Sequence, residues 1–351
     1  MNSIAKRPRV FVTQPIAKSA LDRIKAVADV AVNDDGSRIL AKEALLKGVA
    51  GCEFLLPLMH DKIDRSVIAA NPDLLAIASM AITPTDIDTE EATRRGIVVT
   101  TAPPLVTEAT ADLCFGLMIA IARRIIEGDK LVRRGVFPGG QSNHLLGGGV
   151  SGKTLGLIGG GGRIGAAVAR RARGFQMKVL YWSPRRKPPD VERELDVSFT
   201  QLDELLRRSD FVSVHSPLRP ETRGQIGSSE LALMKPTAFL INTSRGPIVD
   251  ELALVDALQR GRIAGAALDV FAREPEVTFA LLNMTNVVLT PHLGSAVVET
   301  REAMANAVAD SLLALIEGRR PPNIYNPEVF TAWSARREAA QRPSVEHGSE
   351  H

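Results

Sequence analysis

The amino-acid sequence predicts an α/β protein with mostly parallel sheets, and three observations lead to this fold class. The chain has 351 residues, which corresponds to about two domains at roughly 150 residues each. Apolar residues make up 45% and charged residues 24%, an ordinary globular composition that excludes disorder over most of the chain. Strand-like apolar runs alternate with helical patterns in two successive series, which indicates βαβ units.

The first series occupies about the first hundred residues. We expect helices that begin at Ser19 and Ser37, and a third helix that Asp88 caps and Gly96 ends. The expected strands are four short apolar runs at 10–12, 54–59, 74–78 and 97–100. Strands that alternate with helices in this way predict a parallel sheet.

The second series begins after a long helix, expected over 108–134, and a loop with six glycines at 135–149. It runs from residue 154 to about 288, and a further amphipathic helix is expected over 299–316. The tail at 331–351 is polar and aperiodic, which predicts disorder.

Charge and composition argue against several classes of function. The net charge of +3 and an aromatic content of 4% are too low to indicate a nucleic-acid partner. The longest uncharged apolar run, 113–122, has ten residues, whereas a bilayer span needs about 20. Two scattered cysteines, Cys52 and Cys114, predict buried free thiols and no metal site. Because no apolar signal segment is visible near Met1, we expect a cytoplasmic protein without a membrane partner.

A glycine-rich loop follows the first strand of the second series. Gly160, Gly162 and Gly165 form a GxGxxG motif between a strand-like run and a helical pattern. The first glycine permits a tight turn, the second lets the backbone approach a pyrophosphate, and the third lets the helix pack on the strand. A helix is expected over 166–173, and its N-terminus offers free N–H groups to phosphates. Arg163 and Ile164, which lie between the last two glycines of the motif, are expected to contact the cofactor with them. The motif therefore predicts dinucleotide binding, with a simple tight turn as the alternative.

The next strand ends at Ser183, where an NAD site has an acid for the ribose 2′-hydroxyl. Here Ser183 is followed by Arg185 and Arg186. A serine can donate to a 2′-phosphate and an arginine can pair with it, so the sequence favours NADP over NAD. The alternative is a solvated basic turn.

Three apolar strands of the second series each lead into polar residues that can take part in catalysis. Arg245, Glu274 and His292 follow these three strands in turn. Ligands of doubly wound sheets bind at the carboxyl ends of strands, so the three side chains can converge on one crevice.

With the glycine loop, the segments 242–246, 269–275 and 290–295 resemble the D-2-hydroxyacid dehydrogenase family. The resemblance covers about residues 74–319. It implies two doubly wound parallel-sheet domains, a homodimer, and hydride transfer between a nicotinamide cofactor and a 2-oxo or D-2-hydroxy acid. The implied domains are a flavodoxin-like substrate domain at 1–104 and 297–330, and a Rossmann cofactor domain at 105–296 that is inserted into it.

The resemblance also implies a role for individual residues. Arg245, Glu274 and His292 are the implied catalytic set. His292 would donate the proton, Glu274 would hold one ring nitrogen and favour the charged imidazole, and Arg245 would bind a carboxylate and polarise the adjacent carbonyl. Further residues are implied to contact the cofactor, namely Pro217, Thr243, Ser244, Asp269 and Ser295. For Asp269 the alternative is a buried acid that satisfies backbone amides.

The loop at 81–85 departs from the family pattern, which has two glycines in a segment whose amides hold the substrate carboxylate. Here the amides of Ile82 and Thr83 remain as candidates, but both glycines are absent and Pro84 removes a donor. If the family loop has a positive φ at either glycine position, the residues of this chain could adopt it only at a cost in conformational energy.

These observations predict an NADPH-dependent oxidoreductase that acts on CH–OH donors and reduces a small 2-oxo acid, with glyoxylate or hydroxypyruvate first. Two alternatives remain. One is NAD-dependent catabolic oxidation of a different 2-hydroxy acid. The other is a dinucleotide-sensing binding protein of the corepressor type.

Overall fold

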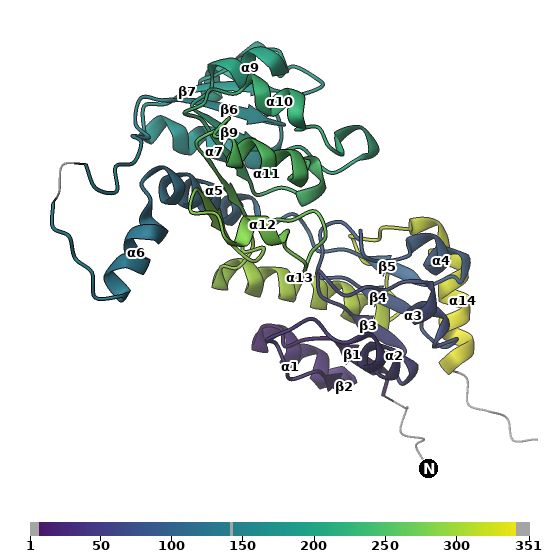
Figure 1. The fold of residues 1–351 in the computed structure, drawn as a ribbon. Coiled ribbons are helices and arrows are strands. Elements are labelled where there is room, and N and C mark those ends of the chain that lie inside the picture. Colours follow the sequence, from purple (N-terminus) through teal and green to yellow (C-terminus); the bar gives the residue numbers. More distant parts are fainter. Residues whose placement is uncertain (1–6, 141–142, 342–351) are drawn as a thin grey trace, which may run out of the picture. The chain divides into compact units, whose positions relative to one another are not determined.

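The computed structural model describes residues 7–140 and 143–341, with side chains described through Glu338. The chain forms two compact units (Figure 1). Unit 1 runs through Leu105 and resumes at Val297, and unit 2 covers Val106–Ala296. Unit 2 is therefore inserted into unit 1. Each unit contains one parallel sheet, so the predicted fold class, two doubly wound α/β domains with one inserted into the other, is confirmed.

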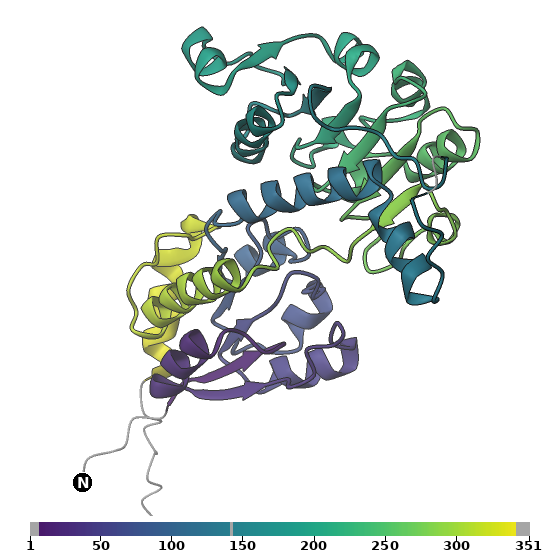
Figure 2. The same cartoon turned by 90° about the vertical axis from the view of Figure 1, so that its left-hand side faces the viewer.

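Unit 1 has a five-stranded sheet in the order β2-β1-β3-β4-β5, and every neighbouring pair is parallel. Its strands are β1 (Arg9–Val12), β2 (Asp29–Val32), β3 (Phe54–Leu56), β4 (Ala76–Ala78) and β5 (Val98–Thr100). Its helices are α1 (Lys18–Val27), α2 (Lys42–Ala50), α3 (Arg65–Ala69), α4 (Thr89–Arg94), α13 (Val298–Ile316) and α14 (Phe330–Gln341). Helices α2, α3 and α4 supply apolar residues to one core, while α1 and α13 lie side by side (Figure 2).

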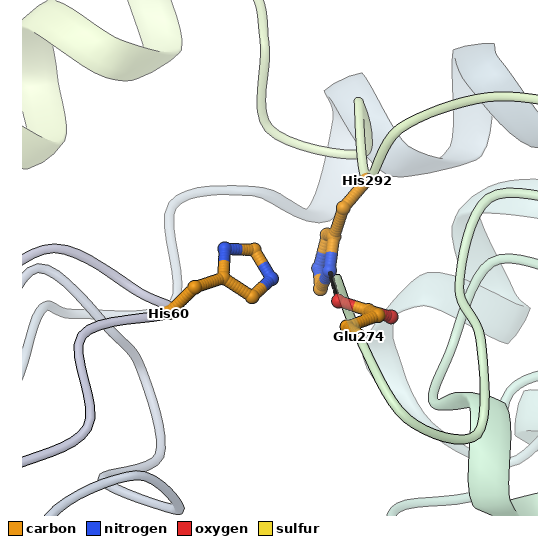
Figure 3. A group of neighbouring side chains, drawn as sticks. All are labelled: His60, Glu274 and His292. Carbon is orange, nitrogen blue, oxygen red and sulfur yellow. Dashed lines mark hydrogen bonds and ion pairs between the residues drawn. The ribbon is translucent and has the colours of Figure 1, made fainter. Parts of the chain in front are cut away.

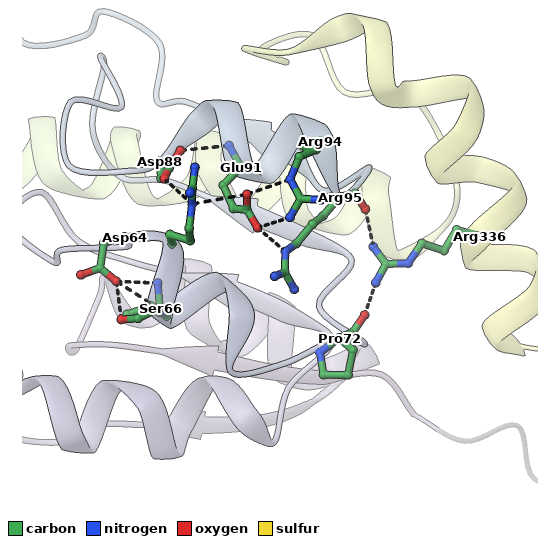
Figure 4. Close-up of polar contacts among 10 residues, drawn as sticks. Asp64, Ser66, Pro72, Asp88, Glu91, Arg94, Arg95 and Arg336 are labelled. Atoms are coloured by element: carbon green, nitrogen blue, oxygen red, sulfur yellow. Dashed lines mark hydrogen bonds and ion pairs between the residues drawn. The ribbon is translucent and has the colours of Figure 1, made fainter.

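The C-terminal helix α14 corrects the expectation of a disordered tail from residue 331. Trp333 is fully buried and stacks on Phe330 with 5.2 Å between ring centroids. Arg336 donates to the carbonyl oxygens of Arg95 and Pro72, which ties α14 to the end of α4 (Figure 4). The expectation is wrong for residues 331–341, and residues 342–351 lie outside the described part of the chain.

Unit 2 has a seven-stranded parallel sheet in the order β12-β11-β10-β9-β6-β7-β8. Its strands are β6 (Thr154–Ile158), β7 (Lys178–Trp182), β8 (Val197–Phe199), β9 (Phe211–Val214), β10 (Phe239–Asn242), β11 (Gly265–Leu268) and β12 (Val287–Leu289). Its helices are α5 (Thr107–Ala122), α6 (Ile125–Arg133), α7 (Arg163–Gly174), α8 (Pro189–Leu195), α9 (Leu202–Arg208), α10 (Ser228–Leu233), α11 (Glu251–Gln259) and α12 (Phe279–Leu282). One core lies under α5 and α7, and a second lies under α9, α10 and α11.

Several expected boundaries differ from the observed ones. The long helix expected over 108–134 is two helices, because Arg124 adopts a left-handed φ of 53° between α5 and α6. Ser19 lies inside α1 instead of capping it, and the helix expected at Ser37 begins at Lys42. Asp88 caps α4 as expected, since its side chain accepts from the Glu91 amide. Within the described ranges, no helix combines enough length and apolarity to cross a bilayer.

Candidate active site

The carboxyl ends of the unit 2 strands bring the expected site residues to one edge of the sheet. The glycine loop follows β6, and His215 follows its neighbour β9. The chain continues from β6 to β7 on one side and returns to β9 on the other, so β6 and β9 border the topological switch point. In doubly wound sheets the ligand crevice lies at that point.

The glycine loop is shaped to accept a dinucleotide. A Cβ on Gly160 would lie 2.7 Å from the Cβ atoms of Leu157 and Tyr181, and a Cβ on Gly165 would lie 2.6 Å from the Gly160 Cα. At Gly162, by contrast, the nearest atom to such a Cβ lies 3.4 Å away, and no side chain caps the N-terminus of α7. The loop is therefore tight where helix meets strand and open where phosphates bind helix N–H groups, so these residues fit a nicotinamide dinucleotide.

The two arginines of the basic turn after β7 have different environments. Arg186 donates from Nε and Nη2 to the two carboxylate oxygens of Glu192, both at 2.8 Å. This pair, with a hydrogen bond from Tyr181, lowers the pKa of Glu192 to about 2. Arg185 is exposed, and its carbonyl oxygen accepts from Ser183 Oγ at 2.7 Å. Of the two arginines named as phosphate ligands from the sequence, only Arg185 lacks a carboxylate partner within the described part of the chain.

His292 and Glu274 form a close pair, as the sequence predicted for a proton donor and its support. His292 Nδ1 lies 2.7 Å from Glu274 Oε2, and the two side chains are 18% and 17% exposed (Figure 3). Figure 3 also draws His60, which belongs to unit 1. The second Glu274 oxygen accepts from the Phe271 amide at 2.9 Å, so the carboxylate is oriented from both sides. Since Glu274 occupies Nδ1, Nε2 is the nitrogen of His292 that can exchange a proton with a substrate.

The backbone of His292 adopts a left-handed φ of 55°, which non-glycine residues rarely adopt. Asp269 holds the turn that contains it. Its Oδ1 accepts from Thr290 Oγ1 and the Leu293 amide, its Oδ2 accepts from the Gly294 amide, and its carbonyl oxygen accepts from the His292 amide. Burial raises the pKa of Asp269 despite these bonds. Asp269 is thus a buried acid that satisfies backbone amides, as in the alternative considered from the sequence, and its contact with the cofactor stays a prediction.

Arg245 follows β10 in a loop that is fixed by side-chain hydrogen bonds. Asn242 Nδ2 donates to the Arg245 carbonyl oxygen at 3.1 Å, and Arg245 Nη1 donates to the Ser244 carbonyl oxygen at 2.7 Å. Ser244 Oγ donates to the Ser216 carbonyl oxygen at 2.6 Å, which ties this loop to the one after β9. Arg245 therefore lies at the same sheet edge as the pair formed by Glu274 and His292.

The remaining residues expected at the cofactor differ in exposure. Thr243 and Ser295 are buried, Ser244 and Ile164 are half-buried, and Arg163 and Pro217 are exposed.

His215, which follows β9, shares a hydrogen bond of 2.9 Å between its Nε2 and Ser213 Oγ, and Ser213 Oγ also lies 3.2 Å from Cys114 Sγ. Burial lowers the pKa of His215 to about 4 and raises that of Cys114 to about 11. Both groups are therefore neutral at physiological pH.

Sequence reasoning did not identify Glu251, which supports the loop that contains Glu274. Glu251 is 8% exposed, and its two oxygens accept from the Ala272 amide and from Thr278 Oγ1, both at 2.5 Å. An acid at the start of an apolar helix is an ordinary helix-dipole feature, so the sequence gave no signal of its loop partners.

In unit 1, the loop at 81–85 lacks the two glycines of the family pattern and needs no left-handed backbone. Among the described residues, those with positive φ do not include any from this loop. The Ala81 amide donates to Ser79 Oγ and the Thr85 amide donates to the Thr83 carbonyl oxygen. The Ile82 and Thr83 amides have no acceptor in the described part of the chain. Two adjacent free amides are a suitable site for a carboxylate.

Comparisons with known proteins agree with this geometry. The family model "D-isomer specific 2-hydroxyacid dehydrogenase, NAD binding domain" matches residues 115–294. A glyoxylate reductase of Thermococcus litoralis is 45% identical over 330 residues, which cover 93% of this chain and 99% of the relative. The crystal structure of a glyoxylate reductase from Paecilomyes thermophila matches with a TM-score of 0.76 and 31% identity, covering 92% of this chain and 99% of that one. An NADPH-dependent glyoxylate/hydroxypyruvate reductase of Sinorhizobium meliloti, solved with NADP and malonate, matches with a TM-score of 0.73 and 31% identity over 92% of this chain and 98% of that one.

Proposed function

The chain belongs to the D-isomer-specific 2-hydroxyacid dehydrogenase family, and on that premise we propose that it reduces glyoxylate or hydroxypyruvate with NADPH. The observation that carries the proposal is the pair formed by His292 and Glu274 at the same sheet edge as an uncapped glycine loop. The names of the relatives from Thermococcus litoralis and Sinorhizobium meliloti support both the substrate and the reaction.

The proposed chemistry divides the work between cofactor and protein. A reduced nicotinamide cofactor, when bound at the glycine loop, supplies the hydride that adds to the carbonyl carbon. His292 holds a proton on Nε2 and donates it to the carbonyl oxygen, which becomes the hydroxyl of the product. Glu274 keeps the imidazole oriented through its contact with Nδ1. Arg245 is the charged group of this edge that can bind the substrate carboxylate and polarise the carbonyl.

The free amides of Ile82 and Thr83 are the proposed binding groups of unit 1 for the substrate carboxylate. They are adjacent, half-buried to exposed, and lack protein acceptors in the described residues. A carboxylate that accepts both N–H groups would gain two charge-assisted hydrogen bonds.

NADPH is the proposed cofactor because the turn after β7 has a serine, Ser183, in place of an acid, and because Arg185 has no carboxylate partner among the described residues. An acid at that position would accept from the ribose 2′-hydroxyl of NAD and would repel a 2′-phosphate. A serine with a nearby cation favours the phosphate.

We also propose a homodimer formed through unit 2. Helix α6 has no buried residue, and five large apolar residues in and directly after it are exposed, namely Ile125, Ile126, Val132, Val136 and Phe137. Exposed apolar surface of this kind marks an interface with another chain. The two buried free cysteines support a reducing, cytoplasmic location. Light scattering at micromolar concentration tests the dimer, and a monomer mass would refute it.

The activity is tested by following the nicotinamide absorbance with NADPH or NADH and a panel of glyoxylate, hydroxypyruvate and pyruvate. We expect turnover with the first two acids and a higher kcat/KM with NADPH at low ionic strength. Turnover only with NAD in the direction of oxidation would favour a catabolic dehydrogenase. Tight dinucleotide binding without turnover on any acid would favour a binding protein instead.

A further inference from the structure

Neighbouring basic residues of the turn at 183–187 have different surroundings. Arg186 faces Glu192 and also lies over the Phe199 ring, with 5.7 Å from its guanidinium carbon to the ring centroid. The Glu192 carboxylate is nearly buried and also accepts from Tyr181 Oη at 2.7 Å. The guanidinium of Arg186 is thus committed to structure within unit 2, and releasing it would leave a buried carboxylate without its cation.

Lys187, the next residue, lies close to the glycine loop. Its amide donates to Tyr181 Oη at 2.8 Å, which fixes its backbone to the same hydrogen-bonded group. A Cβ on Gly161 would lie 3.1 Å from Lys187 Cε and 3.1 Å from Ser183 Oγ. Lys187 and Ser183 therefore border the same surface of the loop, and a side chain in place of Gly161 would crowd both of them.

The charge of Lys187 is not balanced by the protein. In the described portion of the chain, its ammonium group has no hydrogen-bond acceptor and no ion-pair partner, although its side chain is half-buried. The end of the Lys187 side chain approaches the part of the glycine loop that Ser183 also borders, and Ser183 follows β7, where the ribose 2′ position of a dinucleotide is bound in this fold. A half-buried cation placed there is well suited to an anionic group and poorly suited to a neutral hydroxyl.

We propose that Lys187 is a second cation, beside Arg185, that recognises the 2′-phosphate of NADPH together with Ser183, and that Arg186 only supports the turn. The inference rests on the proposed use of NADPH. It assigns part of the preference for NADPH over NADH to Lys187, which was not among the cofactor-binding residues expected from the sequence. A lysine acts on phosphate as a point charge, so it needs no bidentate geometry to do so. NADH offers no charge at that position, so the ammonium gains nothing from binding it.

The test is calorimetric binding of adenosine 2′,5′-bisphosphate and of ADP to the full-length protein and its Lys187→Met variant. We expect the variant to bind the 2′,5′-bisphosphate about tenfold more weakly, as the loss of one charge-assisted contact would give. Its affinity for ADP should change less than about twofold. The matched control is Lys178→Met, which removes the same charge from the opposite, exposed end of β7, and it should leave both affinities unchanged.

Steady-state kinetics add a second readout. In Lys187→Met the KM for NADPH should rise while kcat and the KM for NADH stay near wild type, because the phosphate is remote from hydride transfer. Equal weakening of both ligands would place Lys187 at the pyrophosphate and overturn the proposal, and so would an unchanged preference for the 2′,5′-bisphosphate. If wild-type protein itself binds the two ligands equally, the choice of NADPH fails as well, whereas a wild-type preference that survives Lys187→Met refutes only the role of Lys187.

Discussion

The turn that contains His292 depends on the buried carboxylate of Asp269, and Asp269→Asn tests this dependence. The replacement amide can still accept at one oxygen from Thr290 Oγ1 and the Leu293 amide. Its NH2 group, however, must face the Gly294 amide, which now donates to Asp269 Oδ2 at 2.9 Å. One charge-assisted bond is lost and one buried N–H is left without an acceptor.

The size of the effect follows from these contacts. Loss of the bond to Gly294 costs about 1.5–3 kcal/mol, and the two remaining bonds weaken by about 0.5–1 kcal/mol each when the acceptor becomes neutral. Burial raises the pKa of Asp269, so removing the charge also relieves a desolvation cost. We expect a net loss of about 2–3 kcal/mol in the free energy of unfolding, which lowers Tm by about 5–10 °C for a domain of this size.

The same change should reduce catalysis, because the Asp269 carboxylate holds the Leu293 and Gly294 amides that directly follow His292, whose backbone has a left-handed φ. A displacement of the imidazole by about 1 Å can cost about 10²-fold in rate. We therefore expect kcat to fall by about 10- to 100-fold, measured at saturating NADPH and glyoxylate.

The matched control is Asp256→Asn, an exposed acid of α11 that pairs with Arg260 at 2.6 Å. It should change stability by less than about 0.5 kcal/mol. The reasoning is refuted if scanning calorimetry finds that the two variants melt within about 2 °C of each other. A variant at Asp269 that melts early but keeps wild-type kcat would show that the turn does not position His292.

Three further predictions concern other parts of the chain. His292→Gln and Glu274→Gln should each lower kcat by about 10²–10⁴-fold with little change in the dissociation constant of NADPH, and wild-type turnover by His292→Gln at every pH would sink the proton-donor assignment. Burial lowers the pKa of His215 from 6.5 to about 4, so the folded state favours the neutral ring and the free energy of unfolding falls as the pH falls from 6.5 to 4. Urea unfolding should show a loss of at most about 3 kcal/mol over this range, and His215→Asn should remove this pH dependence. The same pH dependence in His215→Asn as in wild type would contradict the prediction. Trp333→Ala should lower the free energy of unfolding by about 3–5 kcal/mol, because the ring is fully buried, whereas the exposed Thr331→Ala should melt like wild type.

The alternation of apolar runs and helical patterns was sufficient to predict the fold class, because each buried parallel strand is a continuous apolar run. It failed where tertiary context decides. Strand β2 alternates between exposed and half-buried residues and begins with Asp29, so its sequence lacks such a run. The left-handed break at Arg124 lies in a pair of arginines that carry no turn signal. Helix α14 owes its place to one buried tryptophan, which creates no periodic pattern.

In the candidate site, too, some contacts could be predicted from the sequence and others depend on tertiary context. The partnership of Glu274 and His292 was predictable because their motifs follow neighbouring strands, and the structure places their side chains in contact. The pairing of Arg186 was not, since Glu192 lies on a separate helix and nothing in the sequence links the two. The buried role of Glu251 was equally hidden, because burial of a helix-starting acid depends on a loop more than twenty residues later along the chain.

The insertion of unit 2 between Leu105 and Val297 has a consequence for biosynthesis. Unit 2 is contiguous, so the ribosome releases all of it before unit 1 is complete. Unit 1 must wait for α13, whose residues face α1 and β4 and close one side of its sheet. Until then, the first hundred residues expose an apolar face to the cell. The chain therefore emerges with a late-synthesised helix, α13, needed by its first-synthesised sheet, and α14 follows still later.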